Sequence, residues 1–155
     1  MLLLMMRVGT MKTISDMTLL QKRDYLEQSV GAALLWSQPI EQGLKAVLTY
    51  VFKNPAEVDH ADPYKWLANK RTLGRLVGEF KKKVRLPEHF EEIFNQFVED
   101  RNILVHGFFE HYDLYKSQDY ENAIKMIYRL RHNGDVIHNV LRAILKDPMS
   151  ALKFG

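Results

Sequence analysis

The apolar positions along the chain have the spacing of helices. From Thr18 to Lys53 they recur every three or four residues, which is the period of one helix face. Pro39 interrupts this stretch, and a proline inside a helix removes a hydrogen bond and clashes with the preceding turn. We therefore expect either a helical hairpin or one long kinked helix, with a break or bend near Ser37 to Pro39.

Two helices are expected in the middle of the chain. Thr72 suits the N-cap of a helix from Leu73 to Val84, because its hydroxyl can accept a hydrogen bond from the first turn. The next helix follows Pro87, whose fixed backbone angle suits a first turn, and extends to Tyr112. The residues expected to face inward on the first of these helices are Leu73, Leu76, Val77 and Phe80.

The last expected helix is long. Ser117 and Asp119 are the predicted N-terminal cap, and Pro148 stops the helix. Between them, Asn133 and Gly134 mark the place where a bend is expected.

Composition narrows the fold class. The chain has 155 residues, 46% of them hydrophobic, which is enough for one domain with a core. Strand patterns are almost absent, so we predict an all-α fold, an antiparallel bundle of four to five helices. Residues 1–16 are expected to be a disordered leader or an upstream start, 17–147 the bundle, and 148–155 a tail.

The absence of cysteine and of a long apolar run excludes several classes of site. Without cysteine there is no disulfide framework, thiol chemistry or cysteine zinc site, which fits a cytoplasmic location. The opening MLLLMM is far shorter than the roughly 20 residues that cross a bilayer, so no membrane partner is expected. No cofactor or metal site is indicated. The net charge of +3 allows an acidic partner such as RNA.

One charged residue interrupts the apolar stripe of the helix that follows Pro87. At roughly 100° per residue, Arg101 falls near the middle of that stripe. Burying an unpaired charge is costly, so Arg101 needs an ion-pair partner such as Asp100 or Glu99, an exposed cleft or a subunit boundary. The stripe consists of Phe90, Ile93, Phe94, Phe97, Leu104 and Phe108.

Two polar residues lie beside this arginine. Asn102 and His106 are spaced i, i+4, so an amide can hold one imidazole nitrogen and leave the other free. Arg101, Asn102 and His106 are therefore the candidate catalytic residues. Arg131 with His138 matches the same pattern more loosely and is the weaker candidate.

With these residues in place, RNILVH at 101–106 resembles the signature of the HEPN superfamily of small helical proteins. TLGRLV at 72–77 and the long closing helix are similar in order to that family. The resemblance implies an HEPN-like bundle acting as a metal-independent endoribonuclease of toxin or defence type. The alternatives are a non-catalytic HEPN-like module that binds nucleotide, RNA or a partner protein, and a purely structural bundle.

The resemblance gives each candidate residue a role. His106 would take the proton of the RNA 2′-hydroxyl, since an imidazole titrates near neutral pH. Arg101 would bind the scissile phosphate, and Asn102 would fix the tautomer of His106. Cleavage would leave a 2′,3′-cyclic phosphate and a 5′-hydroxyl, and DNA would survive.

The spacing of the two charged groups raises a geometric problem. On an ideal helix Arg101 and His106 lie about 140° apart, so they cannot face one phosphate from a straight segment. Either the helix is distorted near Gly107 or two copies of the chain share the site. HEPN proteins form dimers of this kind, so we predict a homodimer with the motif helices near its twofold axis.

An antitoxin is a further expected partner. Some toxin-type relatives are silenced by a partner nucleotidyltransferase through a tyrosine two residues after the histidine. Phe108 occupies that position here.

A basic run precedes the motif helix, with seven basic residues and one acidic residue between Lys70 and Arg85. It would either guide an RNA backbone or form a solvated helix face. The candidate RNA-binding residues are Lys70, Arg71, Arg75, Lys81, Lys82 and Lys83. Four aromatic residues after the motif would either stack on bases or belong to the core: Phe108, Phe109, Tyr112 and Tyr115.

Overall fold

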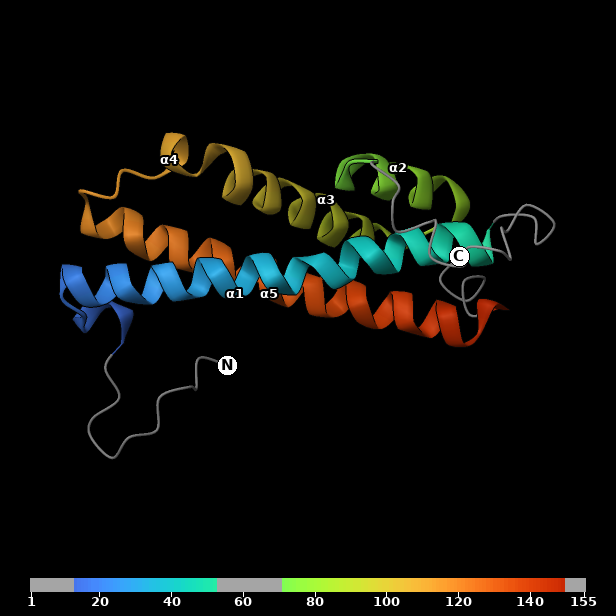
Figure 1. The fold of residues 1–155 in the computed structure, drawn as a ribbon, viewed down its shortest axis with the longest axis horizontal. Coiled ribbons are helices and arrows are strands. Elements are labelled where there is room, and N and C mark those ends of the chain that lie inside the picture. The colour runs from blue at the N-terminus through green and yellow to red at the C-terminus, as the bar shows by residue number, and fades with distance from the viewer. Residues whose placement is uncertain (1–12, 53–70, 150–155) are drawn as a thin grey trace, which may run out of the picture.

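A computed structural model describes residues 13–52 and 71–149, and within these ranges every regular element is helical. The elements in chain order are η1 (Ile14–Asp16), α1 (Leu19–Ala46), η2 (Val47–Val51), α2 (Leu73–Lys83), α3 (Glu88–Asn102), η5 (Ile103–Gly107), α4 (Phe108–His111) and α5 (Ser117–Lys146). η1 is a 3₁₀ turn, whereas η2 and η5 are π-helical turns. The predicted all-helical bundle is confirmed (Figure 1).

The expected leader and tail lie mostly outside the described residues. Residues 1–12 and 150–155 are outside, whereas residues 14–16 form η1. The side chain of Asp16 accepts hydrogen bonds from the backbone and hydroxyl of Thr13, and Ile14 packs against the core. At the other end, α5 stops at Lys146, as Pro148 predicted.

The first helix continues through its proline. Pro39 lies inside α1, so the expected hairpin does not form and no break occurs there. The carbonyl that loses its hydrogen bond to Pro39 belongs to Leu35, which is exposed to solvent and can be hydrated. The next residue, Ile40, is completely buried, so packing on both sides of the proline maintains the helix.

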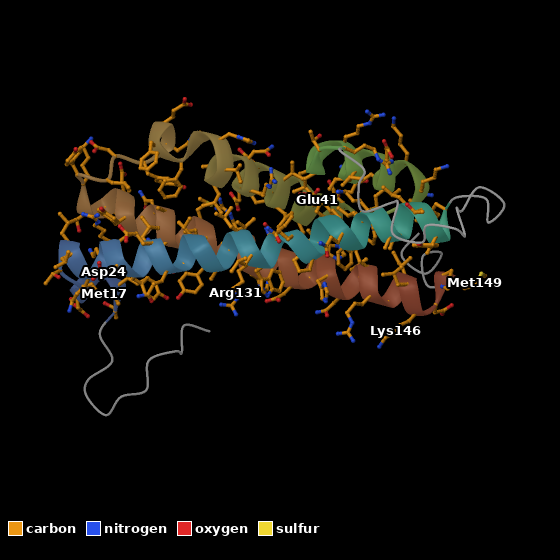
Figure 2. All side chains as sticks on the ribbon, in the orientation of Figure 1. Met17, Asp24, Glu41, Arg131, Lys146 and Met149 are labelled. Atoms are coloured by element: carbon orange, nitrogen blue, oxygen red, sulfur yellow. The ribbon has the colours of Figure 1, made fainter. Side chains whose placement is uncertain are left out.

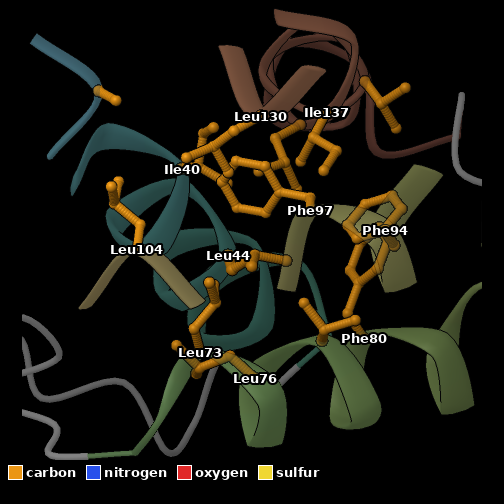
Figure 3. Packing of buried hydrophobic residues seen from close by; sticks show 14 of the residues in the cluster. Ile40, Leu44, Leu73, Leu76, Phe80, Phe94, Phe97, Leu104, Leu130 and Ile137 are labelled. Carbon is orange, nitrogen blue, oxygen red and sulfur yellow. The ribbon is translucent and has the colours of Figure 1, made fainter. Parts of the chain in front are cut away.

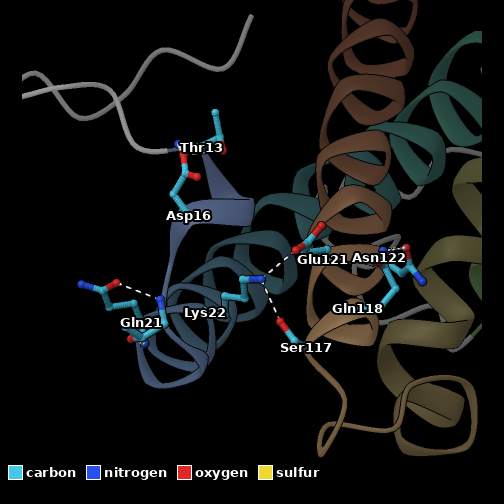
Figure 4. A network of polar contacts seen from close by, with 9 residues as sticks. Thr13, Asp16, Gln21, Lys22, Ser117, Gln118, Glu121 and Asn122 are labelled. Atoms are coloured by element: carbon cyan, nitrogen blue, oxygen red, sulfur yellow. Dashed lines mark hydrogen bonds and ion pairs between the residues drawn. The ribbon is translucent and has the colours of Figure 1, made fainter.

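The two longest helices, α1 and α5, run parallel to each other, and α3 runs antiparallel to α5. Near their N-terminal ends, Lys22 Nζ lies 2.6 Å from Glu121 Oε1 (Figure 4). Further along both helices, the rings of Trp36 and His138 are 6.3 Å apart. Figure 1 shows both helices running from the same end of the molecule. Between α1 and α5 the chain passes through α2 and α3, which return it to the end of the molecule where α1 begins. The two long helices therefore run in the same direction.

The predicted cap of α5 is wrong. Its N-cap is Lys116, which makes no side-chain cap bond, and Ser117 is already the first helical residue. The Ser117 hydroxyl accepts a hydrogen bond from Lys22 instead, over 2.8 Å. The carboxylate of Asp119 accepts the backbone N–H of Asp113, which fixes the turn before the helix.

The predictions for α2 are confirmed. The Thr72 side chain caps the helix by accepting from the Arg75 backbone N–H. All four residues expected to face inward are buried: Leu73, Leu76, Val77 and Phe80. The ring of Phe80 stacks on that of Phe94 with centroids 5.4 Å apart, which joins α2 to α3. Figure 3 shows these side chains meeting Leu44 of α1 in one core.

Gly134 allows α1, α3 and α5 to pack closely, and α5 continues through it without a break. A Cβ at this position would lie 2.6 Å from Trp36 Cζ3, 2.9 Å from Ile40 Cδ1 and 3.1 Å from Phe97 Cε2. The first two distances are shorter than real side-chain contacts. The glycine expected to bend the helix is therefore required for packing.

We predict that Gly134→Ala lowers the free energy of unfolding. Overpacking costs about 1–3 kcal/mol, which outweighs the roughly 1 kcal/mol that alanine contributes to helix stability. Urea unfolding followed by circular dichroism measures the change. Gly31→Ala on α1 is the matched control, because its Cβ would meet nothing within 4 Å; this variant should gain stability. An equal gain in both variants would contradict the packing role.

Candidate functional site

The candidate residues lie where the motif helix changes its winding. Arg101 and Asn102 end α3, and His106 lies in the π-helical turn η5. A π turn closes i→i+5 hydrogen bonds and therefore rotates less per residue than an α-helix. His106 is thus turned back toward the direction of Arg101. This is the distortion near Gly107 that the spacing predicted as one of two possibilities.

Arg101 is partly buried and has no counterion among the residues that the structure describes. The two neighbouring acids expected as partners are engaged elsewhere, and no acid on another described helix pairs with Arg101, which was the third possibility. Asp100 binds Arg129, and Glu99 accepts a hydrogen bond from Gln96 over 3.5 Å. Within the described part of the chain, the guanidinium of Arg101 is therefore not neutralised by an acid.

Asn102 and His106 are both exposed. Neither side chain makes a hydrogen bond within residues 13–52 and 71–149, so the expected bond between them is not formed. The nearest imidazole with a polar contact is that of His111, whose Nδ1 lies 3.3 Å from the Gly107 carbonyl oxygen. The structure thus brings Arg101, Asn102 and His106 to one short segment without fixing the imidazole.

Sequence reasoning missed the central polar contact of this region. The Asp100 carboxylate is completely buried and binds Arg129 of α5 through both oxygens, with Nε–Oδ2 of 2.8 Å and Nη2–Oδ1 of 2.6 Å. Gln96 donates a third hydrogen bond, over 3.0 Å. This hydrogen-bonded carboxylate raises the pKa of the Arg129 guanidinium.

The apolar stripe therefore carries a different charge at its centre from the one expected. Asp100 follows Phe97 by three residues and precedes Leu104 by four, and all three are buried. Arg101 lies at the edge of this face. The spacing of apolar residues in the sequence predicted this helix face. It did not decide whether Asp100 or Arg101 lies at the centre of the face. The partner on α5 decides the choice, because a buried carboxylate requires a cation.

Tyr112 connects the other end of the π turn to the same ion pair. Burial raises the pKa of its hydroxyl, and the charge of Asp100 raises it further. Its ring also packs on Phe108, with centroids 5.3 Å apart. Residues on both sides of η5 are thus held against α5 around Asp100 and Arg129. We call Asp100, Arg129 and Gln96 the carboxylate clamp.

One residue of the basic run reaches the motif, because Lys81 lines a cavity of about 550 Å³ together with Asn102. Arg71 and Arg75 both pair with Glu79, and Lys81 lies 3.4 Å from Glu91. Glu91 is ten residues before Arg101, which is about 15 Å along a helix. The remaining candidates differ: Lys82 and Lys83 are exposed, and Lys70 lies outside the described residues.

The aromatic residues after the motif divide into two pairs. Phe108 and Tyr112 are partly buried and pack against the core, as one interpretation expected. Phe109 and Tyr115 are 82% and 96% exposed. Val105, one turn before Phe109, is also 40% exposed. Val105 and Phe109 are thus two exposed apolar side chains on either side of His106 in the sequence, and we call them the apolar strip.

The described residues show no contact between Arg131 and His138, the weaker candidate pair. Arg131 is exposed and points away from the bundle (Figure 2). His138 packs its ring beside Trp36. The two residues are about 10 Å apart along α5.

We predict that Arg129→Ala lowers the free energy of unfolding by about 3 kcal/mol, because it leaves a buried carboxylate without its cation. This is the low end of the usual range, since Arg129 is 52% exposed and water reaches the pair. Urea unfolding is the measurement. Arg131→Ala, an exposed neighbour on α5, should stay within about 0.5 kcal/mol of the unchanged protein. Similar losses in both variants would refute the clamp.

Comparisons with family models, curated proteins and solved structures find no match to this chain. Within the described residues, no three histidine, cysteine, aspartate or glutamate side chains are grouped to hold a metal ion. None of the described helices is long and apolar enough to cross a membrane.

Proposed function

We propose that this chain is a metal-independent endoribonuclease of toxin or defence type, with Arg101, Asn102 and His106 as its site. The observation that supports the proposal most strongly is the partly buried Arg101 guanidinium, which has no counterion among the described residues. An arginine held this way binds phosphate oxygens well, because its planar donors match them and little water must be displaced.

In the proposed reaction His106 removes the proton of the 2′-hydroxyl. The 2′-oxygen attacks the adjacent phosphorus, and the bond from phosphorus to the 5′-oxygen breaks. Arg101 stabilises the negative charge that builds on the phosphate oxygens in the transition state. The products are a 2′,3′-cyclic phosphate and a 5′-hydroxyl, and the 5′-oxygen takes a proton as it leaves.

A second copy of the chain would supply that proton. One histidine cannot serve as base and acid in the same step, so we propose a homodimer in which His106 of the second protomer is the acid. The apolar strip around His106 supports this arrangement, because Val105 and Phe109 are exposed beside the imidazole. Pairing the strips would bring the two imidazoles together and orient them, which Asn102 does not do in the single chain.

One observation favours a non-catalytic module instead. The Asn102 amide and the His106 imidazole make no hydrogen bond in the described part of the chain, so the tautomer is not set. In that case Arg101 would bind a nucleotide or RNA phosphate without turnover. Both functions predict phosphate binding at Arg101, and cleavage distinguishes them.

We predict that the protein cleaves a mixed RNA pool in EDTA. His106→Ala should reduce the rate by about 10²- to 10⁴-fold, and Arg101→Ala by about 10²- to 10³-fold, as for loss of one transition-state donor. Gel analysis of the products, with tests for cyclic phosphate and 5′-hydroxyl ends, is the measurement. DNA of the same sequence should stay intact.

The matched controls are Arg131→Ala and His132→Ala, because both residues are exposed on α5. Both should cleave like the unchanged protein. Activity that persists in Arg101→Ala and His106→Ala would identify a contaminant. Saturable nucleotide binding without any cleavage would favour the module.

We predict a dimer in light scattering at micromolar concentration, and a monomer after Phe109→Asp. Phe109 is 82% exposed, so the substitution should leave the fold unchanged in circular dichroism. Cleavage should fall with the dimer, because the acid comes from the second protomer. Leu35→Asp, at a position 72% exposed on α1, is the control and should stay dimeric. A protein that is monomeric but fully active would exclude the shared site.

A further inference from the structure

A cavity between α2 and α3 reaches the proposed cleavage site. Its volume is about 550 Å³. The apolar side chains that line it are buried or partly buried, namely Val77, Val98 and Ile103. The polar lining is more exposed and includes Asn102, which follows Arg101 directly in the sequence. An apolar lining with a few polar groups is the usual form of a site for a small organic group.

Two glycines of α2 keep this cavity open. Gly74 and Gly78 are one helical turn apart, and both line it. Glycine inside a helix is less stable than alanine, and neither glycine has a positive φ. A Cβ at Gly78 would meet nothing within 4 Å, and a Cβ at Gly74 would lie 3.7 Å from Val98 Cγ1, an ordinary contact. Packing among the described residues therefore does not require these glycines, and their effect is to leave space in the cavity.

The polar lining combines a side chain that only accepts hydrogen bonds with one that only donates them. Among the described residues, the Glu99 carboxylate accepts only a long bond of 3.5 Å from Gln96. The Lys81 ammonium lies 3.1 Å from Asn95 Oδ1 and 3.4 Å from Glu91 Oε2. An ammonium has three N–H donors, so one remains for a ligand. Asn95 is one helical turn from Glu99, so the carboxylate and this donor lie near each other in the cavity.

We propose that this cavity binds the guanine base of a nucleotide next to the scissile phosphate, an inference that rests on the proposed endoribonuclease function. Guanine has two adjacent N–H donors on its Watson–Crick edge, which match the two oxygens of the Glu99 carboxylate. Its O6 and N7 acceptors match the ammonium of Lys81, since lysine donates to these atoms in base recognition. The other three RNA bases lack two adjacent donors on that edge.

Asn102 connects the base to the phosphate at Arg101. It lies seven residues after Asn95 on α3, which is about 10 Å along a helix, so it marks the end of the cavity toward Arg101. Its amide makes no hydrogen bond with His106, and it can therefore contact the nucleotide instead. A neutral base suits the cavity better than a phosphate, because Glu99 would repel the phosphate charge. Asn102 thus acts in substrate binding in this scheme.

Nucleotide binding tests the cavity without any cleavage. Calorimetric titration of the full chain should show that guanosine 3′,5′-bisphosphate binds about 10-fold or more tightly than adenosine 3′,5′-bisphosphate. Glu99→Gln should bring the ratio of these two affinities close to one. The ratio is the informative quantity, because loss of the charge changes the binding of both phosphates alike. Glu92→Gln is the control, since Glu92 is exposed on the same helix outside the cavity, and it should keep the preference.

Filling the cavity should also remove the preference for guanine. Gly78→Leu adds a side chain at the lining and should not lower the midpoint of urea unfolding, because leucine favours a helix and no atom lies within 4 Å of the new Cβ. Gly31→Leu on α1 is the control, because its Cβ is equally open, and it should keep the preference. Full preference in Gly78→Leu would overturn the proposal, as would equal binding of both bisphosphates by the unchanged protein.

Mapping of RNA cuts separates this inference from the proposed function. Cuts in a mixed RNA pool should fall next to guanosine, and Glu99→Gln should remove this selectivity. Cuts that ignore guanosine would overturn the role of the cavity in RNA recognition and leave the endoribonuclease in place. Guanine-selective binding without any cleavage would refute the endoribonuclease and assign the base site to a non-catalytic module. An absence of both binding and cleavage would overturn both.

Discussion

The buried carboxylate of Asp100 is the constraint on which this molecule depends. A charge with no exposed surface must be neutralised where it lies, and here Arg129 reaches it from another helix with two short hydrogen bonds. The pair fixes the rotation of α3 against α5. Because Asp100 pairs with Arg129, it does not pair with the adjacent Arg101. Arg101 therefore has no counterion among the described residues.

The same contact explains how a widened helical turn is held in place. A π turn has poorer packing than an α-helix and is often found at functional sites. Here Asp100 precedes η5 and Tyr112 follows it, and both lie near Arg129. The turn that carries His106 is therefore supported at both ends by α5. On its outer surface Phe109 is 82% exposed and contacts the ring of Phe108, with centroids 5.8 Å apart.

The sequence predicted the structure best where burial depends on the residues of a single helix. The periodicity of α2 predicted its four buried residues, because a short amphipathic helix has only one way to face a core. The sequence predicted the structure least well where packing between helices that are distant in the sequence determines the result. Pro39 remains inside α1 because Ile40 is buried by other helices, and Gly134 is required by Trp36 on α1 and Phe97 on α3. The choice of Asp100 over Arg101 likewise depends on an arginine 29 residues later, and no local pattern contains that information.

The clamp also bears on whether a phosphate can bind at Arg101. A free carboxylate beside an arginine competes with phosphate for the guanidinium and repels the phosphate charge. Because Arg129 neutralises Asp100, the remaining acid close to Arg101 in the sequence is Glu99. Glu99 is exposed to solvent, so water and salt screen its charge, and it opposes a phosphate at Arg101 much less than an unpaired buried carboxylate would.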